Sequence, residues 1–203
     1  MKHVLAVMIL ATSAHAAQST VVPSGDMDAV WGPATAVNQG HGMTDEIRRA
    51  LAPGAEHDVV ARLLGTWSVR GVAGRNSNPI SQVASVTAML DDAWFELRLT
   101  ENGELSRVAH LGYDGYRASF AMWEVGRGFT SPQARVGDYD SATQILHFRR
   151  TYTIRSRDEL VRVNERISIH FVSEDEIRWQ SWETVGDRPE RNQRDVTFTR
   201  SRP

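Results

Sequence analysis

Two short blocks, Leu63-Leu64-Gly65-Thr66-Trp67 and Leu111-Gly112-Tyr113-Asp114, decide the fold of this chain. Before Gly65 the apolar residues recur at helical spacing; after it the period changes to two, with Trp67 and Val69 on one face. The second block is typical of a strand that ends in a tight turn. Together they predict a helix from about 55 to 64 that runs into an antiparallel β-structure.

The rest of the chain continues in short alternating segments separated by turns. Asn102-Gly103 is a strong hairpin signal, Pro132 indicates an edge or a bulge, and 137–141 reads as a turn. Strands are predicted at 67–71, 83–90, 95–99, 105–111, 116–125, 129–136, 145–152, 160–171, 177–185 and 192–200. Because about ten up-and-down strands leave exposed edges unless the sheet closes, an all-β single barrel is favoured over a two-sheet sandwich.

The N-terminal segment predicts export. A basic start at Lys2, an apolar run and a small-residue site at Ala14-His15-Ala16 describe a signal peptide over 1–16, which is too short to span a bilayer. Residues 17–43 read as a flexible linker. The domain at 44–203 then holds the barrel, with a further short helix from Thr44 before the one at 55–64. A periplasmic or secreted location follows.

The amino-acid composition limits which classes of binding partner are expected. The chain has no cysteine, so its stability must come from a core rather than from disulfides. Its formal net charge is −2, and basic and acidic residues are interleaved, whereas a nucleic-acid binder would show a basic patch. Neither nucleic acid nor a membrane span is therefore expected, and the oligomeric state is left open.

Several blocks together resemble a known bacterial family, the domain of unknown function fifteen-seventy-nine. They span about residues 54 to 200: Glu56-His57, Leu63–Trp67, Leu111–Asp114, Trp123, Gly137 with Asp140, and Thr197-Phe198-Thr199-Arg200. The resemblance implies a lipocalin-like, calycin-type barrel. It implies no activity, because none is established for the family as a class.

A barrel of this size can hold one small ligand among its alternate side chains. Trp123 would line such a cavity if its face, with the small residues Ser119 and Ala121, points inward. The alternative is that Phe120 and Met122 point inward as ordinary core. Tyr113 and Trp182 are further candidate lining residues.

The strand at 160–171 allows two arrangements. If its apolar face points inward, Glu165 is an interior carboxylate that needs a partner, and it could then act as a general base. If the polar face points inward, Arg166 could anchor a ligand carboxylate. A solvated outer face with Glu165 near a rim is the third possibility.

We therefore predict an exported barrel that binds a small apolar or amphipathic molecule through Tyr113, Trp123, Arg166 and Trp182. The alternative is an isomerase- or hydrolase-like enzyme that uses Glu165 or His170. A minor alternative is a haem-binding, nitrobindin-like barrel, which would need His147 or His170 to face inward. No metal spacing is present among the histidines, and no cofactor is predicted.

Overall fold

The computed structural model describes residues 52–74, 76–90, 92–128, 132–156 and 159–202. The predicted signal peptide, the linker and the helix from Thr44 lie outside these residues, so those predictions stand as they were made. Within the described part, no helix is long and apolar enough to cross a membrane.

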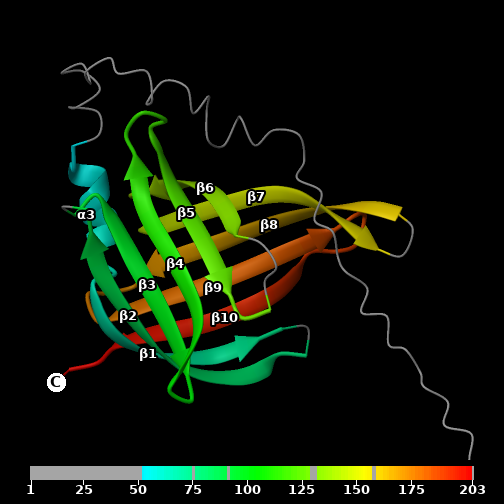
Figure 1. Cartoon of the computed structure of the whole chain (residues 1–203), viewed down its shortest axis with the longest axis horizontal. Helices are drawn as coiled ribbons and strands as arrows, with labels where there is room; N and C mark the ends of the chain where they lie inside the picture. Colours follow the sequence, from blue (N-terminus) through cyan, green and yellow to red (C-terminus); the bar gives the residue numbers. More distant parts are fainter. Residues whose placement is uncertain (1–51, 75, 91, 129–131, 157–158, 203) are drawn as a thin grey trace, which may run out of the picture.

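Ten antiparallel strands close into one barrel, in the order β1-β10-β9-β8-β7-β6-β5-β4-β3-β2 (Figure 1). The all-β, up-and-down barrel expected from the sequence is thereby confirmed, because each strand pairs with its sequence neighbours and β1 pairs with β10. The elements are α3 (Ala55–Ala61), β1 (Gly65–Ala73), β2 (Asn78–Met89), β3 (Trp94–Glu101), β4 (Glu104–Asp114), β5 (Ser119–Gly126), β6 (Gln133–Asp140), β7 (Ile145–Ser156), β8 (Glu159–Phe171), β9 (Glu176–Val185) and β10 (Arg191–Arg200).

Two strand predictions were wrong. Residues 137–141 were read as a turn, yet β6 continues through Asp140, because Arg135, Gly137 and Tyr139 keep the inward alternation of the strand. The fifth strand begins at Ser119 rather than at 116, and Tyr116 lies exposed in the preceding turn.

The core is a continuous set of inward side chains from the strands, closed at one end by α3. Every one of these residues is nearly inaccessible to solvent. The largest fully buried members are Trp67, Phe95, Phe148, Phe198 and Leu63. The middle of the barrel is thus packed with apolar side chains.

Helix α3 lies across one end of the barrel, beside the ends of β2, β3 and β4 (Figure 1). Trp67 is 1% exposed, and its Nε1 donates a hydrogen bond to the carbonyl of Leu63, 2.7 Å away. The guanidinium of Arg200 stacks over the Trp67 ring and donates to the carbonyl of Leu64. Trp67 is therefore a structural plug at the helix end.

Candidate functional site

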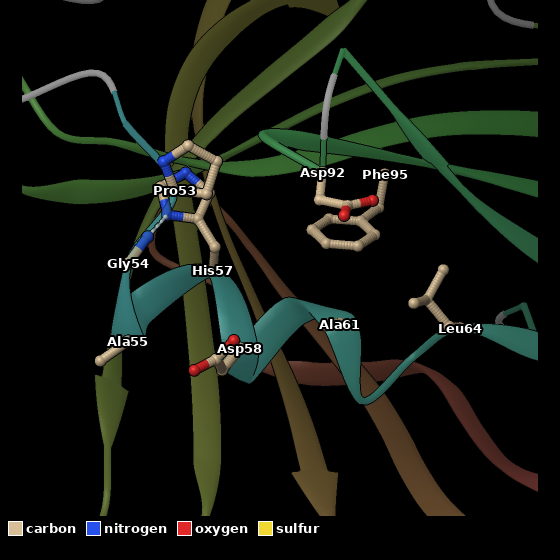
Figure 2. Close-up of a pocket in the computed structure, with 9 residues that line it drawn as sticks. All are labelled: Pro53, Gly54, Ala55, His57, Asp58, Ala61, Leu64, Asp92 and Phe95. Carbon is tan, nitrogen blue, oxygen red and sulfur yellow. Dashed lines mark hydrogen bonds between the residues drawn. The ribbon is translucent and has the colours of Figure 1, made fainter. Parts of the chain in front are cut away.

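A hollow of about 470 Å³ lies between α3 and the start of β3 (Figure 2). Its apolar wall comes from Pro53, Ala55, Ala61, Leu64 and Phe95. Its polar groups are His57, Asp58 and Asp92. This volume is within the range of small-molecule sites.

His57 holds the helix start at the edge of this hollow. The backbone N–H of Gly54 donates to Nδ1 of His57 at 3.0 Å, the dashed line in Figure 2, and the ring is almost fully buried. In the neutral ring the remaining proton is then on Nε2. The ring also meets Tyr113 edge-on, with 5.8 Å between ring centroids. His57 therefore stabilises the start of α3.

The opposite end of the barrel carries a second feature, which we call the charged ring. It consists of inward-facing charged side chains from six strands: Arg107, Glu124, Arg135, Arg150, Glu165 and Arg194. Each continues the alternation of the apolar core along its own strand, as Glu124 does two residues after Met122.

Ion pairs link most of the charged ring. Arg135 is 2% exposed; its Nη1 donates to Glu124 at 2.8 Å, and its Nε and Nη2 bind the Glu165 carboxylate at 3.1 and 3.0 Å. Arg150 donates to the same carboxylate. Nη1 of Arg107 lies 2.5 Å from Oε1 of Glu124, an ion pair without hydrogen-bond alignment. Buried charges are tolerated in proteins when they are paired in this way.

The pKa values reflect this pairing. Burial opposes ionisation of Glu165, but the charges and hydrogen bonds of Arg135, followed by those of Arg150, outweigh it and hold the pKa of Glu165 below its usual value. Burial likewise opposes the charge on Arg135, but Glu165 and Glu124 raise its pKa. Burial raises the pKa of the neighbouring Tyr152 to about 12. Glu165 and Arg135 are therefore both ionised near neutral pH.

Arg194 differs from the other arginines of the ring. The residue is 8% exposed, its Nη2 donates to Oε1 of Gln82 at 2.7 Å, and its buried Nε has no hydrogen-bond partner among the described residues. Burial, and after it the charge of Arg107, lower the pKa of Arg194 to about 10, while Glu124 acts in the other direction. Among the described residues, the side chain that accepts a hydrogen bond from this guanidinium is an amide rather than a carboxylate.

The structure places only one of the four sequence-predicted site residues inside the barrel. Tyr113 is inward and half-buried, and packs edge-on against Phe120 at 5.1 Å. Trp123 lies on the outer face, where its ring stacks on His110 with centroids 5.4 Å apart. The inward residues of that strand are Phe120 and Met122, so the alternative of ordinary core is confirmed and Trp123 does not line the interior.

Arg166 and Trp182 are neighbours on the outer face of β8 and β9. The Arg166 guanidinium stacks 3.7 Å from the Trp182 ring centroid and forms two hydrogen bonds to Glu190. The Arg166 side chain is 44% exposed. Neither residue can line the interior, because the apolar face of β8 points inward and the polar face points outward.

That orientation also decides the positions of the candidate catalytic and haem residues. Glu165 is interior and paired, as the first arrangement of its strand required. His147 and His170 lie on the outer face, because their neighbours Leu146, Ile169 and Phe171 are the buried residues of β7 and β8. An interior haem ligand from either histidine is excluded by this placement.

Five residues of the charged ring were not predicted from the sequence, although a signal for them was present: Arg107, Glu124, Arg135, Arg150 and Arg194. Each charged residue lies in phase with an apolar face, as Arg194 does with Val196 and Phe198. In a sequence, one charged residue on an otherwise apolar strand face indicates that the strand has reached solvent at its end. The pairing of the strands in the barrel is needed to show that these charged side chains meet in one ring.

Comparisons with known proteins support the fold alone. No family model matches the sequence, and no curated protein matches it. A solved structure titled "Crystal Structure of Rv2717c from M. tuberculosis" is similar with a TM-score of 0.50 and 14% identity, over 74% of this chain and 100% of that chain. At this identity the likeness supports a barrel fold and carries no ligand or activity over.

Proposed function

We propose that this chain is an exported barrel that binds a small apolar or amphipathic molecule in the hollow between α3 and β3. The observation that carries the proposal is the hollow itself: about 470 Å³, with an apolar wall and three polar side chains. The packed middle of the barrel argues for a site at its end. Export, and membership of the domain of unknown function fifteen-seventy-nine family, are parts of this proposal that rest on the sequence.

The polar groups of the hollow suggest which amphipathic molecules fit best. Asp58 and Asp92 are exposed carboxylates beside the apolar wall, and His57 is fixed by Gly54. A ligand whose apolar body packs on Ala61 and Leu64 would place a hydrogen-bond donor or a positive group near these carboxylates. Neutral and cationic amphipathic molecules are therefore preferred over anionic ones.

The enzyme alternative receives less support from the same structure. A general base needs a carboxyl whose pKa is raised toward neutrality, whereas the pKa of Glu165 is lowered by two arginines. His170 lies on the outer face, away from the hollow. The described residues therefore favour binding over acid–base chemistry.

A fluorescence titration with the neutral apolar probe N-phenyl-1-naphthylamine tests the proposal. We expect saturable enhancement with the wild-type chain and binding weakened by about tenfold in Ala61→Leu, which fills the hollow by three carbons. Ala55→Trp is a second filling variant, since Ala55 is exposed and lines the same hollow. Ala142→Leu, in the exposed turn before β7, is the matched control. Equal binding by all four proteins would refute this site.

A further inference from the structure

The charged ring contains a cation that its own side chains leave incompletely satisfied. Arg135 bridges two carboxylates and Arg150 binds one of them. Arg194, by contrast, forms one hydrogen bond to the neutral Gln82 and no ion pair within 4 Å to any described residue. The carboxylates of Glu124 and Glu101 act on Arg194 from beyond ion-pair distance, so an anion in direct contact with its Nε would recover free energy that burial of the guanidinium costs.

The barrel register fixes Arg194 in this position. A β-bulge between Asn192 and Arg194 makes Gln193 the extra residue on β10, opposite the Trp182–Ser181 step of β9. After the bulge, Arg194 is in phase with Val196 and Phe198 and points inward. Before the bulge, Asn192 points outward, although it is only two residues from Arg194. The backbone N–H of Gly74 donates to the carbonyl of Gln193 at 2.8 Å and pins the bulge.

A second cation is close by. The charge of Arg107 acts on Arg194 strongly enough to be the largest contribution to its lowered pKa after burial. Arg107 is paired with Glu124, and its side chain is 32% exposed, so it is the more accessible of the two arginines. Two guanidinium groups whose charges act on one another favour a negative charge near both.

We infer that Arg194, with Arg107 beside it, forms an oxyanion-binding site at the end of the barrel opposite α3. Nε and Nη of Arg194 would donate to two oxygens of one carboxylate or phosphate, the geometry that a guanidinium offers best. Gln82 holds the Arg194 side chain in place through its Nη2 bond. This site is separate from the hollow against α3, and the inference does not depend on the proposed function.

Thermal unfolding in low millimolar phosphate, acetate or chloride at constant ionic strength tests the inference. We expect phosphate or acetate to raise the wild-type Tm in a saturable way, with an apparent affinity weakened by about tenfold or more in Arg194→Gln. A response to phosphate alone identifies a phosphate site, and a response to acetate identifies a carboxylate site. Arg149→Gln, on the outer face and 69% exposed, is the matched control and should keep the response.

The anion-free proteins supply an independent readout. Because Arg194→Gln removes a buried cation that has no direct ion pair to a described residue, its Tm without anion should equal or exceed that of the wild type. Arg107→Gln is the second variant, and it should weaken the anion response while leaving Arg194 in place. The inference is overturned if chloride stabilises as well as both oxyanions, or if Arg194→Gln retains the full response.

Discussion

Gly137 of β6 faces the interior of the barrel and lies against the ring of Phe148. A Cβ at this position would lie 2.3 Å from the carbonyl oxygen of His147 and 2.7 Å from Cδ1 of Phe148. Gly112 has the same relation to Trp94, 2.6 Å from Cδ2. Because these two glycines have no Cβ, the aromatic rings of Trp94 and Phe148 can pack directly against the strand backbone. Both glycines therefore serve packing within strands and are not turn residues.

We therefore expect Gly137→Ala to lower the free energy of unfolding by about 1–3 kcal/mol or more, because backbone and ring must both move. Urea denaturation followed by tryptophan fluorescence measures it. The comparison is Gly54→Ala, whose added methyl group would meet nothing nearer than 3.7 Å and should cost less than about 1 kcal/mol. Equal losses in the two variants would contradict this packing.

Residue identities alone left the inward face of two strands undecided. The strand with Trp123 carries acceptable core residues on both faces, and β8 carries arginines on one face and apolar residues on the other with Glu165 among them. Tryptophan and arginine can each cover the outer surface with their apolar atoms, as Arg166 and Trp182 do here. Only the strand partners on either side decide which face is interior.

At the scale of elements, the last strand fastens the helix to the barrel. Arg200 of β10 donates from Nη1 to the carbonyl of Leu64 at 2.6 Å and from Nη2 to that of Arg62 at 3.3 Å, so it satisfies carbonyls that a helix end leaves unpaired. Its guanidinium also covers the Trp67 ring. The sequence blocks Leu63–Trp67 and Thr197–Arg200 are thus in direct contact and form one structural unit.

Arg200→Met should accordingly destabilise the protein by about 2–3 kcal/mol, through the loss of charged hydrogen bonds to buried carbonyls. Arg202→Met is its control: that side chain is 82% exposed and, within the described part of the chain, pairs only with Asp175, so we expect a change within about 0.5 kcal/mol. Chemical denaturation of both variants measures their free energies of unfolding. If Arg202→Met lost as much stability as Arg200→Met, the role of Arg200 in holding the helix to the barrel would be ruled out.

The charged ring gives the fold an acid-sensitive element. The folded pKa of Glu165 lies below its ordinary value of 4.5, so the unfolded chain takes up the proton more readily. The stability that Glu165 contributes is therefore present above pH 4.5 and is lost as the pH falls through the folded pKa. Asp195, Glu96 and Glu190 act in the same direction from the surface.

We expect Glu165→Gln to lower stability at pH 7 by about 3–5 kcal/mol, because Arg135 and Arg150 lose a shared counter-charge. The same variant should lose less stability than the wild type on going from pH 6 to pH 3. Denaturation midpoints across this range test the prediction. An unchanged pH dependence in Glu165→Gln would show that the surface carboxylates alone account for it.

For the whole molecule, the architecture was predictable and the site was not. Helical spacing up to Leu64, the period change at Gly65 and the regular turns were enough to predict a closed barrel with a helix at its start, because they reflect local chemistry. The hollow depends on how α3 meets β3, and the charged ring on how six strands align. Both arise from long-range register, which a single sequence does not reveal.

Export is tested on the whole chain by the mass of the mature protein. If residues 1–16 form a signal peptide, the chain recovered from its native host should begin at Ala17. Intact-mass measurement with N-terminal sequencing identifies the first residue. A mature chain that retains Met1 through Ala16 would contradict the export prediction and leave the barrel unaffected.

The most direct test of the central claim is native mass spectrometry of the chain purified from its native host, with Ala61→Leu prepared alongside. We expect a wild-type complex heavier than the chain by one small apolar or amphipathic molecule, and loss of that added mass when Ala61→Leu fills the hollow. A ligand-free mass for the wild type, or the same added mass in both proteins, would contradict a binding site between α3 and β3.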